Sequence, residues 1–299
     1  MNTLTLFAGC VAIWGTTWLA ITYQLGLVAI EASVAYRFLL AAALLAAYSW
    51  LRRLPMRFSA SQHASLAALG VLMYSAGYLF VYRAELHVAS GLVAVGYSAS
   101  PLLAMFGMRI AFRQPMTARM ALGALFGIAG VALVYLPEIG SANHRGSVAL
   151  GALFTTVAVL VVTLGSLLAH RNHQQKLVGW PTMAWSMGYG GLVSLIGALV
   201  LGEPLSIDWS PGYVISLLYL TTFGSILAFA GFLELLGRIG PARASYIGVM
   251  VPIVALVISA LFEDFAWHPL TALGVAISVV GNVLVLRKAP AWGRERRPE

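Results

Sequence analysis

Hydrophobic residues lie in long runs along this chain, and polar residues gather in the short stretches between the runs. In "FLLAAALLAAYSW" (38–50), for example, apolar residues occupy nearly every position rather than alternate ones. A helix needs about 20 such residues to cross a lipid bilayer. The pattern predicts ten membrane-spanning helices, at residues 4–25, 31–51, 64–83, 88–110, 117–136, 147–169, 180–201, 212–235, 242–262 and 269–286.

The composition indicates that lipid surrounds these helices. Of the 299 residues, 60% are hydrophobic and 9% are charged, whereas a soluble domain is about 25% charged. The strands of a membrane β-barrel would alternate apolar and polar residues, and these runs do not. We therefore expect an all-α integral membrane protein in contact with the lipid bilayer. Little chain is left between the runs, so no soluble domain is expected.

The formal net charge is +8, and its placement indicates membrane topology rather than nucleic-acid binding. If the amino terminus is cytoplasmic, fifteen of the 18 Lys and Arg residues fall in cytoplasmic loops or in the carboxy-terminal tail. Arg83 and Arg145 fall outside, and Arg37 lies within a helix. This is the positive-inside pattern, and it predicts that both termini are cytoplasmic.

The single cysteine, Cys10, excludes an internal disulfide and a cysteine-based metal cluster. It ends the sequence "LFAGC", which resembles a lipoprotein cleavage box. The stretch before it lacks a basic flank, and the apolar run continues beyond it. We therefore expect a retained first span, and neither a cofactor nor a metal.

An internal repeat relates the two halves of the chain at an offset of 151 residues. The match covers the fourth and fifth spans against the ninth and tenth. Five spans per half is an odd number, so the second half is inverted relative to the first. The sequence thus predicts two inverted five-helix repeats, residues 1–140 and 141–288, followed by a basic cytoplasmic tail at 289–299. Three residue pairs carry the match: Pro101 with Pro252, Gly123 with Gly274, and Gly130 with Gly281.

Pro101 and Pro252 are predicted to break the fourth and ninth helices near their middle. Proline lacks an N–H and clashes with the carbonyl four residues back, which frees the carbonyls of Tyr97 and Gly248. In lipid a freed carbonyl needs a partner, such as a water-lined cavity or the ammonium group of a substrate. One such proline is equally well explained by an ordinary kink. Two at matching positions of an inverted repeat favour a substrate site between the halves.

Several short sequences carry a family resemblance: "AIWGTTWLA" (12–20), "AYRFLLAAALL" (35–45), and the related endings "ALGALFGIAGVALV" (121–134) and "ALGVAISVVGNVLV" (272–285). With the two prolines, they resemble the EamA-type branch of the drug/metabolite transporter superfamily, and within it the YddG-type amino acid exporters. The resemblance spans the whole chain and implies a multi-pass protein of the bacterial inner membrane. Glu263 stands eleven residues after Pro252, where the family pattern has a Glu, but Phe112 takes the equivalent place after Pro101.

Aromatic residues recur at a spacing of four on three predicted helices, which places them on one face of each helix. One interpretation is an aromatic-walled cavity, which suits apolar and aromatic side chains and also attracts cations. Helix packing with local hydrogen bonds is equally open for any single residue. Trp14, Tyr74 and Trp185 lie too deep for an interfacial belt, whereas a belt position is open for Tyr82 near the outer interface. The predicted substrate-binding residues are Trp14, Trp18, Tyr74, Tyr78, Tyr82, Tyr97, Ser98, Ser100, Trp185, Tyr189, Phe229 and Tyr246.

Arg37 is the one basic residue well inside a predicted span, where a charge is costly. It could meet a substrate carboxylate or snorkel to the membrane surface, and its place in the "RF" pattern of the family favours a structural role. The acidic residues map to helix ends, and the histidines map to loops or helix ends, so no proton carrier is evident. We therefore expect transport without proton coupling.

A secondary transporter of small organic solutes explains the matched helix breaks best. An intramembrane enzyme would need a catalytic cluster, and neither Ser98 nor Ser100 has a visible base, so no enzymatic activity is expected. A channel would show charged rings or a filter sequence, and carriers of phosphate esters would need several deep Lys or Arg residues. We expect export of aromatic and other neutral amino acids by alternating access, with aromatic or cationic drugs as the alternative. The protein is expected to be a monomer or a homodimer.

Overall fold

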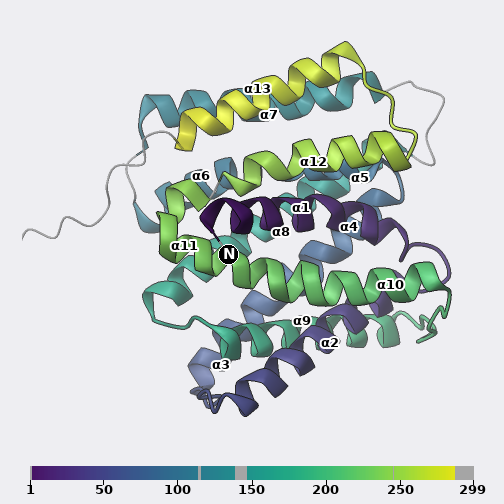
Figure 1. Ribbon diagram of the computed structural model, residues 1–299, viewed down its shortest axis with the longest axis vertical. Coiled ribbons are helices and arrows are strands. Elements are labelled where there is room, and N and C mark those ends of the chain that lie inside the picture. The colour runs from purple at the N-terminus through teal and green to yellow at the C-terminus, as the bar shows by residue number, and fades with distance from the viewer. Residues whose placement is uncertain (1, 114–115, 139–146, 245, 287–299) are drawn as a thin grey trace, which may run out of the picture.

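Helices make up most of the described chain (Figure 1). The computed structural model describes residues 2–113, 116–138, 147–244 and 246–286. Two π-helical turns, η1 (Val71–Ala76) and η3 (Leu220–Leu227), and a 3₁₀ turn, η2 (Leu136–Glu138), adjoin the α-helices. The α-helices are α1 (Thr3–Thr22), α2 (Ile30–Leu51), α3 (Ala60–Gly70), α4 (Gly77–Glu85), α5 (Ser90–Tyr97), α6 (Ser100–Phe112), α7 (Ala118–Tyr135), α8 (Val148–Gln174), α9 (Trp180–Val200), α10 (Pro211–Tyr219), α11 (Ala228–Ala244), α12 (Ile247–Phe262) and α13 (Pro269–Leu286).

The helix lengths fit a multi-pass membrane protein. The predicted all-helical architecture is confirmed for the described residues, although α12 and α13 are apolar but shorter than a full span. Their crossing of the bilayer, which would complete the ten predicted spans, stays a prediction. The predicted boundary at 140–141, Arg145 and the tail at 289–299 lie outside the described residues. Among the described residues, eight helical runs are long and apolar enough to cross a membrane: 3–22, 30–51, 60–85, 90–112, 118–138, 148–174, 180–200 and 211–232.

Side-chain caps fix the residues at which several helices begin. Asn2 accepts a hydrogen bond from the Thr5 N–H at 2.7 Å at the start of α1. Ser59 and Gln62 form a reciprocal capping box at the start of α3. Such caps satisfy N–H groups that have no partner inside the helix. The starts of α7, α8 and α10 are capped in the same way by the hydroxyls of Thr117, Ser147 and Ser210.

The two π-helical turns interrupt the third and eighth helical runs. At the end of η3, for example, the Ala228 N–H bonds to the carbonyl of Phe223, five residues back. A π turn disturbs the regular ladder of backbone hydrogen bonds, and such turns are frequent at functional sites. Trp14 of α1 reaches this turn, because its indole N–H donates to the Gly224 carbonyl at 3.2 Å. The eighth run is thus tied to α1 at its irregular point.

The fourth helical run is interrupted just before Pro101. α5 ends at Tyr97, and α6 begins at Ser100 with Pro101 in its first turn, where a proline costs no helical hydrogen bond. The predicted break at Pro252 is absent, because α12 continues through it. One interior proline removes a single backbone hydrogen bond, and packing of α12 against α1 and α5 holds the helix together.

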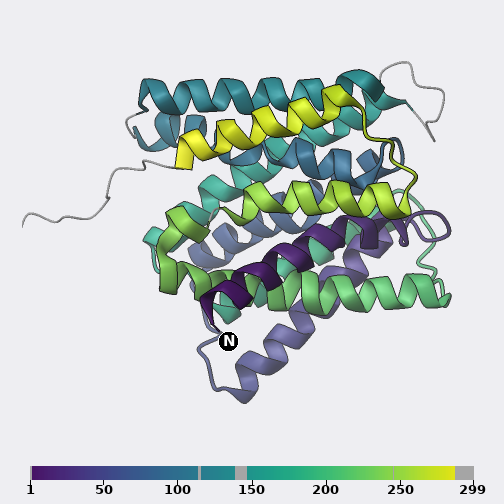
Figure 2. The same cartoon turned by 45° about the horizontal axis from the view of Figure 1, so that its top comes forward.

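α7 and α13 lie side by side along one edge of the molecule, and α2, α3 and α9 lie at the opposite edge (Figure 1, Figure 2). Glycines allow α7 and α13 to approach closely. A Cβ on Gly130 would lie 2.5 Å from the carbonyl oxygen of Gly274, and a Cβ on Gly123 would lie 2.7 Å from that of Gly281. In lipid, close contact between small residues replaces the hydrophobic driving force for helix association.

We predict that Gly130→Ala loosens the α7–α13 pair and lowers the thermal unfolding midpoint in detergent, because the added methyl group would overlap the Gly274 carbonyl. Overpacking of this kind costs about 1–3 kcal/mol. Gly9→Ala on α1 is the matched control, since a Cβ there meets no atom within 4 Å. Equal midpoints for the two variants would show that the pair does not depend on close glycine contact.

Candidate functional site

A central cavity of about 620 Å³ lies between helices of both halves of the chain. α1, α2, α4, α5 and α6 contribute from the first half, and α8, α11, α12 and α13 contribute from the second. A volume of this size holds a small organic molecule. The wall contains these residues singled out in the sequence: Trp14, Trp18, Arg37, Tyr74, Tyr78, Tyr97, Ser98, Ser100, Pro101, Phe229 and Pro252.

Aromatic rings contact one another around this cavity. The ring centres of Trp18 and Tyr97 lie 5.1 Å apart, and those of Trp14 and Phe229 lie 5.3 Å apart, both edge to face. This arrangement is the favourable one for aromatic pairs, because the ring edge is positive and the face is negative. The wall therefore presents fixed ring surfaces to an apolar or aromatic group.

Arg37 lies in the cavity wall and is 1% exposed, so its guanidinium does not snorkel to the membrane surface. Its Nε donates to the Ser225 hydroxyl at 3.2 Å, and its Nη2 donates to the Tyr78 hydroxyl at 3.5 Å. Its Cζ lies 4.4 Å from the centre of the Tyr78 ring, a cation–π contact. Nη1 has no hydrogen-bond partner among the described residues. A buried donor of this kind needs an acceptor, which a ligand in the cavity can supply.

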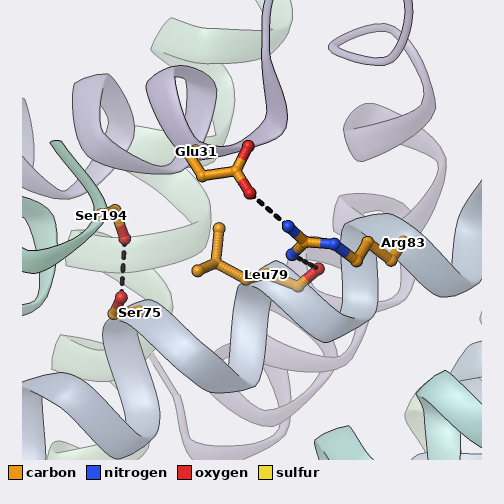
Figure 3. A network of polar contacts seen from close by, with 5 residues as sticks. All are labelled: Glu31, Ser75, Leu79, Arg83 and Ser194. Carbon is orange, nitrogen blue, oxygen red and sulfur yellow. Dashed lines mark hydrogen bonds and ion pairs between the residues drawn. The ribbon is translucent and has the colours of Figure 1, made fainter. Parts of the chain in front are cut away.

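The acidic residue that shares α2 with Arg37 does not neutralise it. Glu31 forms an ion pair with Arg83 of α4 (Figure 3). The same view shows a Ser75–Ser194 hydrogen bond of 2.8 Å, which ties η1 to α9. Within the described part of the chain, no ion pair joins Arg37 to a carboxylate.

The helix interruption before Pro101 also faces the cavity. The Ser98 hydroxyl donates to the Val95 carbonyl at 2.6 Å and lies 3.0 Å from the Ser278 hydroxyl of α13. Tyr97 and Gly248, the residues whose carbonyls the prolines were predicted to free, both line the cavity. Backbone polar groups of this kind are tolerated at membrane depth where they line a cavity.

Two predicted substrate-binding residues on α9 lie outside the cavity wall. The Trp185 indole N–H donates to the Met56 carbonyl at 3.1 Å, and the Tyr189 hydroxyl lies 2.9 Å from Nδ1 of His63. These contacts anchor α9 to the segment before α3 and to the start of α3. Tyr246, directly before α12, is also absent from the wall. The spacing of four between Trp185 and Tyr189 predicted that they share a helix face, but it did not predict which segment that face contacts.

Several wall residues carry no signal in the sequence that would have singled them out. Phe232 is the exception, since it follows Phe229 by three residues and so shares its helix face. The others are mostly apolar or small hydroxyl residues, which are common in every membrane helix. They include Thr17, Ile21, Met73, Val81, Val162 and Ser166.

A second cavity of about 480 Å³, the acidic vestibule, adjoins the first. Its polar wall is formed mainly by Glu85, Glu138, Glu263, Asp264 and two histidines. The sequence placed these acids at helix ends and predicted no buried carboxylate. Glu85 differs, because it ends α4 but is only 6% exposed.

A thin layer, the partition, separates the two cavities. Ile21 and Val81 line the central cavity, whereas Thr22, next to Ile21, and Glu85, four residues after Val81, line the vestibule. Tyr82, a predicted substrate-binding residue, is fully buried in this layer and donates to the Gln24 side chain at 2.6 Å. We define the partition by Ile21, Gln24, Val81 and Tyr82.

We predict that Trp14→Phe lowers the thermal unfolding midpoint in detergent, because it leaves the Gly224 carbonyl of η3 without its indole donor. Loss of a partner for a buried polar group costs about 1–3 kcal/mol. Trp209→Phe is the control, since Trp209 is 78% exposed. If both variants unfold at the parent temperature, the indole bond does not stabilise the π turn.

Curated relatives of similar length carry transporter names. An uncharacterized transporter of Archaeoglobus fulgidus is 23% identical over 93% of this chain and 96% of its own length. The uncharacterized inner membrane transporter YedA of Escherichia coli is 26% identical over 91% of this chain and 87% of its own. A solved crystal structure has a similar fold, with a TM-score of 0.67 and 17% identity over 95% of this chain and 96% of that one.

The family comparison agrees with this fold and these relatives. The model of the EamA-like transporter family matches residues 1–136 and 147–287, which is nearly the whole chain. Relatives in Escherichia coli and Bacillus subtilis are named as transporters. This protein is therefore a membrane transporter that belongs to the EamA-like transporter family.

Proposed function

We propose that this protein exports amino acids with aromatic or other neutral side chains across the bacterial inner membrane, by alternating access and without proton coupling. The observation that carries the proposal is the unpaired Nη1 of Arg37 in an aromatic-walled cavity. The charge pattern supports the orientation, with both termini in the cytoplasm.

Arg37 offers a site for a carboxylate. A guanidinium binds a carboxylate through parallel N–H···O bonds, and its planar fork loses little freedom on doing so. Contacts with Ser225 and with the Tyr78 ring hold the group in place before a ligand arrives. A buried cation without an anion is unfavourable. A substrate carboxylate would remove this cost by pairing with the Arg37 guanidinium, and this pairing would favour binding.

The remaining wall suits the rest of an amino acid. Trp14, Trp18, Tyr97 and Phe229 present ring surfaces that favour an apolar or aromatic side chain. Hydroxyl and carbonyl groups near the interruption before Pro101 are placed to accept hydrogen bonds from an ammonium group. Thus the cavity wall offers both a cationic group and hydrogen-bond acceptors.

Export of aromatic or cationic drugs is the second candidate, because aromatic walls also attract cations. The buried charge of Arg37 counts against it, since like charges repel strongly where the dielectric constant is low. Neutral aromatic molecules without a carboxylate would leave Nη1 unpaired. The two candidates therefore differ in the response that they predict for an Arg37 variant.

Reciprocal contacts support the inverted repeat on which alternating access depends. At the offset of 151 residues, Gly123 and Gly130 correspond to Gly274 and Gly281. Gly123 packs on Gly281, and Gly130 packs on Gly274, which is the pairing that a two-fold axis produces. The same offset carries η1 to residues 222–227, within η3. Two halves related in this way can rock about a site between them.

Counterflow into proteoliposomes tests the proposed function. Vesicles loaded with unlabelled tryptophan or phenylalanine should accumulate the labelled amino acid from outside without an ion gradient. A strict requirement for a proton gradient would contradict uncoupled transport. No exchange of any neutral amino acid, together with uptake of a lipophilic cation, would favour the second candidate.

We predict that Arg37→Gln lowers the apparent affinity for the amino acid, because the carboxylate loses its charged partner. Truncation of one member of a buried charged pair costs about 2–5 kcal/mol, so exchange at low substrate concentration should be nearly abolished. Arg57→Gln, at an exposed loop arginine, is the matched control. Unchanged amino acid affinity in a correctly folded Arg37→Gln protein would exclude the carboxylate site.

A further inference from the structure

Glu85 is a buried acid without a hydrogen-bond donor. It lines the acidic vestibule, and neither of its carboxylate oxygens has a partner within the described part of the chain. A carboxylate in such surroundings is strongly disfavoured, whereas the neutral carboxyl is tolerated. The surroundings of Glu85 in this structure therefore favour its neutral carboxyl.

Glu263 lines the same vestibule in contrasting surroundings. Its carboxylate accepts hydrogen bonds from the Ser90 N–H at 3.2 Å, from the Ser90 hydroxyl at 2.5 Å and from the Ser259 hydroxyl. Ser90 begins α5, and a helix N-terminus favours negative charge. The Glu263 carboxylate therefore has hydrogen-bond donors that the Glu85 carboxyl lacks among the described residues.

The other groups around Glu85 in the described part of the chain supply no hydrogen-bond partner either. Glu263 and Arg37 of α2 are the ionisable groups close enough to act on the Glu85 carboxyl electrostatically. Arg83, next to it on α4, is paired with Glu31. Near its start, α8 contacts His87 through Gly151. The charged residues of α8, Arg171 and His173, lie in its last turn, at the opposite end of the helix. The remaining ionisable groups nearby are Tyr74 of η1, Tyr78 and Tyr82 on its own run, Tyr97 of α5, and Glu138, Asp264, His87 and His268 on the vestibule wall.

Glu85 is mechanically linked to the partition. It lies three residues after Tyr82, one turn further along α4, and Tyr82 bonds to Gln24 beyond the end of α1. Separation of α1 from α4 would break this bond and admit vestibule water to the Glu85 carboxyl. Hydration of Glu85 and opening of the partition are therefore parts of one movement.

We propose that Glu85 is a proton-binding site that controls the partition between the vestibule and the central cavity. The closed partition holds a neutral Glu85 carboxyl. On opening, its O–H bond breaks, the carboxylate keeps the electron pair, and the proton passes to vestibule water. The proton returns by the same route when the partition closes, so no proton crosses the membrane. The proposal rests on alternating access from the proposed function but not on the identity of the substrate.

The sign of the pH effect follows from linkage. The closed state binds the proton more tightly than the open state, so acid in the vestibule favours closure. For one proton, the open-to-closed ratio changes by up to about tenfold per pH unit. The open state should therefore be less populated as the vestibule becomes more acidic.

Thiol accessibility tests this proposal without a substrate. The full chain with Cys10→Ser and Ile21→Cys places one thiol under the partition, since Ile21 is buried and lines the central cavity. A membrane-impermeant methanethiosulfonate is applied from the vestibule side at acidic and at neutral pH. Leu27→Cys in the same background is the matched control, because Leu27 is 82% exposed. The Ile21→Cys labelling rate is divided by the Leu27→Cys labelling rate at each pH. Both thiols react as thiolates, so this ratio removes the effect of pH on thiol ionisation.

With Glu85 present, this ratio should fall by up to about tenfold per pH unit toward acid. The Glu85→Gln and Glu85→Leu variants carry no charge at this position. In both, the labelling ratio should be independent of pH and equal to the low ratio of the parent at acidic pH. A ratio that does not vary with pH in the parent, or varies equally in both folded variants, would overturn the role of Glu85 and leave alternating access standing. Absence of I21C labelling at every pH would overturn alternating access itself.

Discussion

The buried guanidinium of Arg37 is the group around which the centre of this transporter is arranged. Its Nε is held by Ser225 of η3, and its own backbone carbonyl accepts the Thr221 hydroxyl at 3.4 Å. The Ser225 hydroxyl in turn donates to Leu220, five residues back in the π turn. An irregular turn in one helix thus supports a charged side chain in another, whose Nη1 has no hydrogen-bond partner among the described residues.

The size of side chains decides where helices meet and where a cavity remains. Gly130 and Gly274 bring α7 and α13 into backbone contact, and Gly70 with Gly190 does the same for α3 and α9. At the centre, the large rings of residues such as Trp14, Tyr97 and Phe229 keep the helices apart. Small residues permit tight helix packing at the edges in lipid, and large residues leave open space between the halves. Both results follow from the distribution of small and large side chains along the helices.

Helix spacing in the sequence predicted faces correctly but not the partners of those faces. Trp14 and Trp18 recur at a spacing of four, and both line the cavity. Trp185 and Tyr189 have the same spacing, and they bond to Met56 and His63 instead. Which of two equivalent faces borders the cavity depends on contacts between distant segments, and periodicity within one helix contains no information about them.

The sequence alone determined the helical membrane fold, because unbroken apolar runs of this length are stable only as helices in lipid. It also indicated the irregular region before Pro101, since proline restricts the backbone locally. The tertiary structure decided that α12 continues through Pro252, that Arg37 is buried without an acid, and that Glu85 lies against the partition without a donor. These three features depend on which atoms from other helices surround each residue, and only the folded chain brings those atoms together.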